Sequence, residues 1–515
     1  MAIDSKKIAK NTIFLYVRLI LVFGVTLYTS RVVLDKLGVD DYGLYNVVFS
    51  VIGLLSFLNG TLSAGTSRFI TFALGRKDKE NLKITFSTSL CAHFLLACVI
   101  LLLGETLGIW YLNDVMVCPP ERFQAAFIVY QISILTTMVS ILQVPFTSEI
   151  IAHEEMDIYA YIGIYEAIAK LVVVFLLVRS PFDKMVFYAS LIAVVVMSVF
   201  LIYVYFSYRK FEEVRFKVLF DKKKFKEILY FSGWNILANL SNTVMKQGVI
   251  VLFNAFFAPV VVAAQALANQ ISQAMMQFVD NVRQAVNPQI IKLYAEEKYG
   301  ESKVLTIQSA EYIFDLLLLL GVPCIMIMPK LLDIWLVEVP EYSVEFARLI
   351  IIENILSNFS AAFYTPMVAA NKIQKNSIAA VVLCIIQFGL LYILFIIGLG
   401  PIWARYIGIV FCIIWSFVVK PYILWKDIDY HWGEMFICFG RCIRTLVIVI
   451  ACCYALFLII PQTTLINCLL QAFLAVIVVI VTTYLFMGQT MKDRIRTYVL
   501  NKTFDKVTQS YKRKK

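Results

Sequence analysis

The stretch Phe231–Arg283, FSGWNILANLSNTVMKQGVIVLFNAFFAPVVVAAQALANQISQAMMQFVDNVR, decides the fold class. It predicts two helices of membrane-spanning length, each carrying a polar stripe along an otherwise apolar sequence. On the first helix the polar side chains recur at steps of four, three and four residues, which places them on one face. They are Asn235, Asn239, Asn242 and Lys246, and the second helix continues with Gln265, Asn269, Ser272, Gln273, Gln277 and Asp280.

Lys246 is the residue of this stretch that fits hydrocarbon least. An ammonium group within a membrane span is expensive unless it faces protein or a water-filled cavity. Single Asn and Gln residues often serve only to hold transmembrane helices together. Two consecutive helices with polar stripes and an internal lysine instead favour a wet cavity, so we expect a substrate-binding site here.

Composition places the whole chain in a membrane. Of its 515 residues, 61% are hydrophobic and only 16% are charged. Apolar runs of about 20 residues recur from end to end, each long enough to cross a bilayer. We therefore expect an all-α polytopic membrane protein with about 14 transmembrane helices. The 11 cysteines form no metal or disulfide pattern, and no cofactor is expected.

The net charge of +11 reflects membrane orientation rather than binding to nucleic acid. Lys and Arg gather in alternate short connections, which is typical of loops on the cytoplasmic side. The distribution predicts that both termini are cytoplasmic. The tail ending in Tyr511–Lys515 would then lie near the anionic inner leaflet.

Sequence marks divide the chain into two similar parts and an appendix. Phe146–His153 and Tyr364–Asn371 share an aromatic residue, Thr and Ala in the same order, which favours a parallel repeat of two six-helix lobes. Such repeats place substrate near the membrane midplane between the lobes. The predicted division is an N-terminal lobe 1–208, a basic cytoplasmic linker 209–227, a C-terminal lobe 228–425, two extra helices in 426–490 and a basic cytoplasmic tail 491–515.

Several motifs carry a family resemblance. Asn11–Arg18 (NTIFLYVR) and Tyr28–Val48 (YTSRVVLDKLGVDDYGLYNVV) resemble the start of bacterial polysaccharide flippases. These are Wzx-type members of the MOP superfamily, related to MATE drug exporters and lipid II flippases. Ile151–Met156 (IAHEEM) and Tyr161–Ala167 (YIGIYEA) resemble the turn between the fourth and fifth spans of that family.

The resemblance implies a MATE-like, two-lobed fold. It also implies a function: moving undecaprenyl-pyrophosphate-linked oligosaccharide across the bacterial inner membrane by alternating access, for surface polysaccharide or lipopolysaccharide biosynthesis. Lipid II flippases use cationic residues in the cavity, and Arg18 and Lys246 occupy broadly comparable helices here. The expected partners are the lipid-linked oligosaccharide and membrane lipids, without nucleic acid, and the protein is expected to be a monomer.

The chemistry of the candidate cavity residues suits such a substrate. Arg18 can bind phosphate through two hydrogen bonds, while Lys246 acts as a point charge. The amides both donate and accept, so they suit sugar hydroxyls. The alternative for Arg18 is that it extends toward the cytoplasmic headgroups. The full candidate set is Arg18, Asn46, Asn235, Asn239, Asn242, Lys246, Gln265, Asn269, Gln273 and Gln277.

Three acidic residues within predicted spans are candidates for coupling to H⁺ or Na⁺. They are Glu311, Asp315 and Glu353. Intramembrane carboxylates can carry ions, although carboxylates near the ends of spans are more often hydrated. Two other charged pairs, Glu166 with Lys170 and Asp280 with Arg283, are expected to be structural ion pairs.

Other function classes fit the sequence less well. There is no GxxxxGK[ST] phosphate loop, and no outer connection is long enough for a catalytic domain, so we do not expect an enzyme. The three histidines, His93, His153 and His431, are isolated in sequence and suggest no metal site. The alternatives are a MATE-type cation-coupled exporter of small molecules, a lipid II flippase, or a scaffold without transport. A cation exporter should have an acidic or aromatic cavity, whereas Lys246 is basic.

Overall fold

The computed structural model describes residues 5–75, 79–153, 155–215, 221–223, 225–226, 240–370, 372–461, 464–486 and 492. All regular secondary structure within these residues is helical, which confirms the predicted all-α class. In chain order the helices are α1 (Ser5–Leu37), α2 (Val39–Gly53), α3 (Ser56–Gly75), α4 (Lys79–Leu103), η1 (Gly104–Gly108), α5 (Ile109–Asp114), η2 (Pro120–Arg122), α6 (Phe123–Ala152), α7 (Met156–Val178), α8 (Lys184–Lys210), η3 (Glu212–Val214), η4 (Val244–Gly248), α10 (Val249–Phe256), α11 (Pro259–Ala295), α12 (Tyr299–Trp335), α13 (Ser343–Phe359), α14 (Tyr364–Ala369), α15 (Gln374–Ile396), α16 (Trp403–Ile413), η5 (Ile414–Val419), α17 (Lys420–Ile428), α18 (Trp432–Ile459) and α19 (Leu465–Phe486).

Many of these helices can cross a membrane. Within the described residues, 9 helical segments are long and apolar enough to do so, and the protein is a multi-pass membrane protein. The predicted number of 14 is consistent with this but is not fixed by it. Helix α11 is long but carries the polar stripe of the sequence, which explains why apolarity alone does not select it.

The chain forms two compact units that interleave in sequence. Unit 1 contains Met1–Gln270, Leu332–Phe346 and Gln374–Gly408. Unit 2 contains Ile271–Leu331, Ala347–Ile373 and Ile409–Lys515. The predicted lobes, linker and tail follow a repeat in the sequence rather than compactness, and they stay a prediction.

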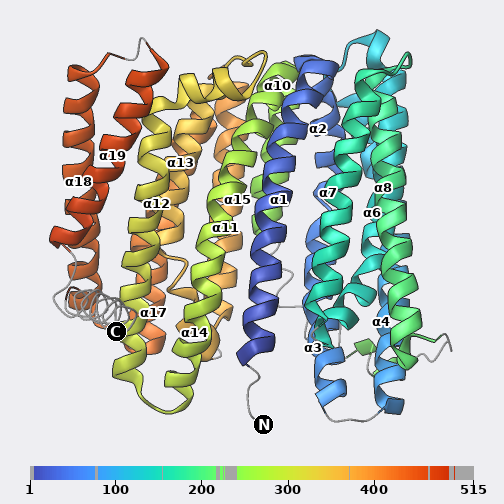
Figure 1. Ribbon diagram of the computed structural model, residues 1–515, viewed down its shortest axis with the longest axis horizontal. Coiled ribbons are helices and arrows are strands. Elements are labelled where there is room, and N and C mark those ends of the chain that lie inside the picture. Colours follow the sequence, from blue (N-terminus) through green and yellow to red (C-terminus); the bar gives the residue numbers. More distant parts are fainter. Residues whose placement is uncertain are drawn as a thin grey trace, which may run out of the picture. The chain divides into compact units, whose positions relative to one another are not determined.

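In unit 1, α6 is the central helix and packs against α2, α3, α4 and α8, while α7 packs against α1 and α8. Figure 1 shows α6, α7 and α8 as neighbouring long helices. The core between them is largely aromatic: the Phe86 and Phe146 rings lie 5.4 Å apart, and Phe146 lies 6.0 Å from Phe200. Edge-to-face packing of this kind adds to the burial of apolar surface.

A wide helical turn in unit 1 depends on glycine. The Tyr130 hydroxyl donates a hydrogen bond of 2.6 Å to the carbonyl of Gly104 in the π-helical turn η1. A Cβ atom on Gly108 would lie only 1.7 Å from the same hydroxyl. The absence of a side chain at Gly108 is therefore what allows α6 to approach this turn so closely.

One ion cluster joins three helix ends in unit 1. Arg122 donates to Asp41 at 2.8 and 2.6 Å and to Asp183 at 2.5 Å. Asp183 also caps α8 by accepting from the backbone N–H of Val186 at 3.0 Å. Burial raises the pKa of Asp183, but the hydrogen bonds from Arg122 and Val186 outweigh it and hold the pKa below its usual value.

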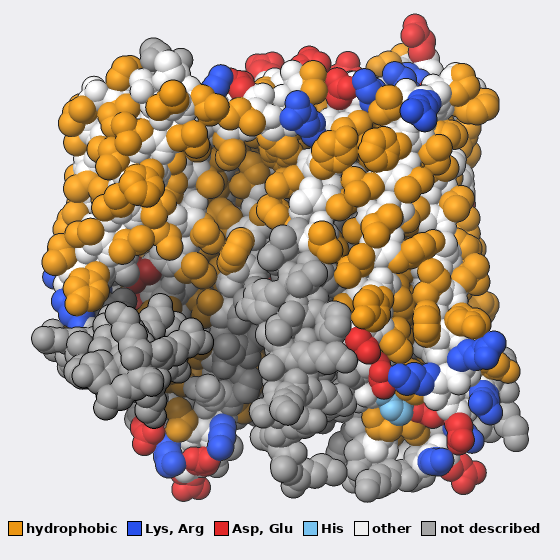
Figure 2. All heavy atoms as spheres, in the orientation of Figure 1, with side chains coloured by type: hydrophobic (Ala, Val, Ile, Leu, Met, Phe, Trp, Pro, Cys, Tyr) orange, Lys and Arg blue, Asp and Glu red, His pale blue; other side chains and the backbone are white. Residues whose placement is uncertain are grey.

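The surface of unit 1 also fits a membrane. Over α6, α7 and α8, Figure 2 shows a continuous band of hydrophobic side chains with charged side chains gathered at the two ends of the helices. Lys170 lies inside the apolar helix α7 and pairs with Glu166 at 2.6 Å, which confirms the expected structural ion pair. An apolar band between charged ends is the pattern of helices exposed to lipid.

Unit 2 contains the last two long helices. Helix α18 packs against α19, and the Arg444 guanidinium lies 3.9 Å from the centre of the Phe486 ring. Large apolar side chains of this pair remain exposed, including Ile459 and Ile466. Exposed apolar side chains of this size suit helices that face lipid.

Candidate functional site

Lys246 lies in the π-helical turn η4, and its side chain is exposed. No hydrogen bond or ion pair to it occurs within the described part of the chain. Its neighbours face protein instead: a Cβ on Gly53 of α2 would lie 3.2 Å from the Gln247 side chain, and one on Gly248 would lie 3.1 Å from Phe388 of α15. Single π-helical turns inside helices are frequent at functional sites. The turn η4 carries the exposed ammonium group of Lys246.

The rest of the first stripe is only partly described. Asn242 is exposed, like Lys246, in the preceding turn of the same segment. Asn235 and Asn239 lie outside the described residues. Arg18 lies within α1, but its side chain also lies outside what the structure describes. The predicted cationic pair therefore stays a prediction.

The first part of the second stripe makes contacts inside unit 1. Gln265 is buried and donates to Asn269 at 2.8 Å. Gln270 donates to the Tyr42 hydroxyl of α2 at 2.9 Å, and Asn46 donates to the Tyr42 carbonyl at 2.7 Å. Of these three bonds, the one from Gln270 links α11 to α2, a role that an amide in a membrane often takes. The other two join residues four apart on the same helix.

The later part of the stripe belongs to unit 2. Gln273 is exposed and Gln277 is half-buried. Ser272 pairs with Asn354 of α13, with distances of 3.1 and 2.9 Å between their polar atoms. Asp280 forms the expected ion pair with Arg283 at 3.2 Å.

The three candidate ion-coupling acids lie in different surroundings within unit 2. Glu311 of α12 accepts from Arg441 of α18 at 3.1 Å, so a cation already neutralises it. Asp315 is half-buried one turn further along α12. Glu353 is half-buried on α13, with the Cys412 sulfur 4.0 Å from its carboxylate. Their coupling role stays a prediction.

Sequence reasoning did not single out Lys420, which is buried. Lys420 begins α17, is only 7% exposed, and donates to the Ser360 carbonyl at 2.8 Å. Its ammonium also lies 5.5 Å from the centre of the Trp415 ring. A buried lysine normally needs such partners. Lys420 stands near the end of an apolar run, and this position made it resemble a residue at the membrane edge.

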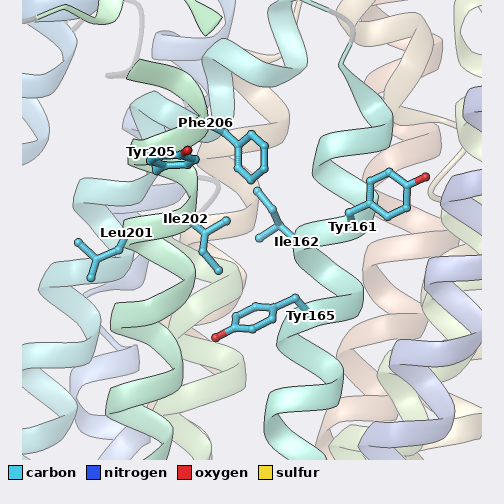
Figure 3. A pocket seen from close by; sticks show the side chains of 7 residues that line it. All are labelled: Tyr161, Ile162, Tyr165, Leu201, Ile202, Tyr205 and Phe206. Carbon is cyan, nitrogen blue, oxygen red and sulfur yellow. The ribbon is translucent and has the colours of Figure 1, made fainter. Parts of the chain in front are cut away.

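A shallow apolar groove of about 510 Å³ runs between α7 and α8 and contains none of the predicted site residues. Figure 3 shows its lining, with Tyr161, Ile162 and Tyr165 from α7 and Leu201, Ile202, Tyr205 and Phe206 from α8. The Tyr165 hydroxyl donates to Ser198 at 3.0 Å, which satisfies it at the lipid-facing surface. The groove thus belongs to the outer apolar band.

Comparison with protein families identifies the chain. Residues 8–294 match the model of a family described as polysaccharide biosynthesis protein. The chain belongs to this polysaccharide biosynthesis family. The match includes the segments that carry the resemblance to Wzx-type flippases, and it also includes η4 with Lys246. No curated protein sequence shows a significant match to the chain.

Solved structures show the fold of this polysaccharide biosynthesis protein. An inward-facing MATE multidrug resistance transporter of the MOP superfamily is similar to it with a TM-score of 0.65 and 15% identity, over 77% of this chain and 93% of that one. A MOP superfamily transporter from Pyrococcus furiosus is similar with a TM-score of 0.59 and 15% identity, over 81% and 96% of the two chains. These likenesses confirm the predicted MATE-like fold.

Proposed function

We propose that this chain is a flippase for a lipid-linked oligosaccharide of the undecaprenyl-pyrophosphate type, acting in surface polysaccharide biosynthesis. The observation that carries the proposal is the exposed Lys246, in a π-helical turn of a polysaccharide biosynthesis family member. A cation without a protein partner among the described residues, in a membrane span, is suited to attract an anionic substrate group. A MATE-like fold supports transport rather than catalysis.

The lipid carrier presents a pyrophosphate next to its glycan. We expect the cationic candidates to bind the pyrophosphate and the amides to bind the glycan. Lys246 would bind the pyrophosphate as a point charge, assisted by Arg18. Asn242, one turn away and exposed, would bind the first sugar hydroxyls. Gln273, which is exposed, and Gln277, which is half-buried, would offer further amides to the glycan.

Transport would follow alternating access, in which the cavity opens to one side of the membrane at a time. Both termini would lie in the cytoplasm of a bacterial cell with the chain in its inner membrane. H⁺ or Na⁺ coupling through Asp315 or Glu353 fits their half-buried positions better than coupling through Glu311, which is paired with Arg441. The working unit would be a monomer.

Two other transporters share the fold and remain alternatives. The exposed Lys246 disfavours a MATE-type exporter of small cations, because its ammonium group would repel a cationic substrate. For the MOP superfamily transporter from Pyrococcus furiosus, the reverse polarity of its binding pocket suggests a different function. The same reasoning favours an anionic substrate here. A lipid II flippase would share the pyrophosphate chemistry and differ in the glycan.

Deletion of the gene, followed by analysis of lipid-linked oligosaccharides in each leaflet, tests the proposal. A flippase predicts that complete lipid-linked oligosaccharide accumulates in the cytoplasmic leaflet and that surface polysaccharide is lost. Accumulation of lipid II instead would indicate the lipid II alternative. Normal amounts in both leaflets would refute a flippase role altogether.

A further inference from the structure

Three side chains with metal-binding atoms meet where α6 ends. Glu149 and His153 are one helical turn apart, so they project from the same face. The third, Glu213, comes from the short η3 turn that follows α8. His153 is isolated in the sequence, but the folded chain brings Glu213 to it from another element.

The spacing of these groups is close to that of a metal site. His153 Nε2 lies 2.7 Å from Glu213 Oε1 and 3.3 Å from Glu149 Oε1. The ligand atoms of the three residues all lie within 4.8 Å of one another. Ligands bound to tetrahedral Zn²⁺ at about 2.0–2.2 Å stand roughly 3.3 Å apart, so only small side-chain shifts would be needed.

Glu149 gives an independent reason to expect a ligand. Its side chain is fully buried, and neither carboxylate oxygen has a hydrogen-bond partner among the described residues. The contact with His153 at 3.3 Å brings the charges together without the alignment of a hydrogen bond. A buried carboxylate is stable when it is paired or when it coordinates a metal.

The surroundings of the cluster hold it in place. The imidazole of His153 stacks on the buried ring of Phe211, with centroids 4.2 Å apart. Two neighbouring acids that the structure describes have their own cations: Glu212 pairs with Lys79 at 3.3 Å, and Glu155 pairs with Lys210 at 2.6 Å. The cluster of Glu149, His153 and Glu213 is therefore distinct from a general acidic surface.

We propose that Glu149, His153 and Glu213 form a binding site for one divalent transition-metal ion, with Zn²⁺ as the best fit. One imidazole and two carboxylates are ligands that suit Zn²⁺, and three protein ligands leave a fourth position for water. The ion would link the end of α6 to the turn after α8. The proposal does not depend on the transported substrate.

Metal content tests the site directly. The full-length protein is purified with an affinity tag that contains no histidine, and Zn²⁺ binding is measured by calorimetry and elemental analysis. The wild type is expected to bind one Zn²⁺ per chain. His153→Ala, Glu149→Gln and Glu213→Gln should each weaken binding by about 100-fold or more. Glu212→Gln is the matched control, because this adjacent carboxylate pairs with Lys79, and its Zn²⁺ affinity should equal that of the wild type.

A second measurement covers variants that fold poorly. Removal of metal from the wild type with a chelator should lower its melting temperature by several degrees, and added Zn²⁺ should restore it. His153→Ala should show no response to either treatment. If the wild type binds no Zn²⁺ and the chelator leaves its melting temperature unchanged, the cluster is a structural ion cluster only and the proposal is refuted. Equal Zn²⁺ affinity in all variants would also refute it.

Discussion

Replacement of Lys246 should impair transport without impairing folding. The side chain is exposed, and no partner would be left unpaired within the described residues. The change in folding free energy is therefore expected to stay within about 0.5 kcal/mol, as for other surface positions. A hydrogen bond to a charged group contributes about 1.5–3 kcal/mol, so Lys246→Ala should weaken substrate binding roughly 10- to 150-fold.

The sign of the charge at position 246 determines the expected transport of the other two variants. Lys246→Arg keeps the cation and should retain part of the transport, although its flat guanidinium changes the geometry. Lys246→Glu replaces attraction by repulsion. Two unit charges at 4 Å interact by about 4 kcal/mol at an effective dielectric constant of 20, so this variant should transport less than Lys246→Ala.

The assay is surface polysaccharide produced in a deletion strain, normalised to the amount of membrane-inserted protein. The double variant Glu166→Gln/Lys170→Gln is the matched control, because it removes an intramembrane lysine together with its partner on α7. The control should export normally. Normal export by both Lys246→Ala and Lys246→Glu would refute the role of Lys246 in binding an anionic substrate.

The packing of unit 1 supports three further predictions. Asn254→Leu removes three hydrogen bonds to Tyr111 and Val117, at about 0.6 kcal/mol each in a membrane, and should lower stability by about 2 kcal/mol, against about 0.6 kcal/mol for Tyr111→Phe in thermal denaturation. Gly43→Ala would place a Cβ 2.2 Å from the Pro259 carbonyl oxygen and should destabilise by about 1–3 kcal/mol, whereas Gly24→Ala, with open space around it, should not. Asp183 has a lowered pKa in the folded state, so its contribution is present above the unfolded pKa near 3.8 and is lost as pH falls below it. The difference in melting temperature between wild type and Asp183→Asn should thus shrink between about pH 5 and pH 3; a constant difference would contradict the pKa shift.

The fold class was predictable because each membrane span is a continuous apolar run in the sequence. Long apolar runs can only be helices in a bilayer, since the backbone must satisfy its own hydrogen bonds. The motifs in Asn11–Arg18 and Tyr28–Val48 indicated the family, and the family match confirms it. Local pairs such as Glu166 with Lys170 were also predictable, because residues four apart on a helix are neighbours.

The partners that come from distant elements were not predictable. Gln270 donates to the Tyr42 hydroxyl of α2, a contact that no local pattern in the sequence indicates. Glu311 was expected to be a candidate for ion coupling, and nothing nearby in the sequence pointed to its pairing with Arg441 of α18. The cluster around His153 needed Glu213, which a local pattern cannot supply.

The partner of the buried amide Asn254 was also not predictable from the sequence. Its apolar neighbours, Val251–Phe253, predict only a helix core. In the folded chain Asn254 is fully buried and binds both backbone groups of Val117, which lies in a loop far away in sequence. The sequence alone therefore does not show whether a polar residue in an apolar run stabilises helix packing or binds substrate.

Transport by the purified protein in liposomes tests the central claim most directly. The vesicles would contain a fluorescent undecaprenyl-pyrophosphate oligosaccharide, and the fraction accessible to an external reagent would be followed over time. A flippase predicts protein-dependent exchange of the labelled lipid between leaflets, strongly reduced by Lys246→Glu and retained in Glu166→Gln/Lys170→Gln. No exchange above that of protein-free vesicles, or equal exchange by wild type and Lys246→Glu, would contradict the account.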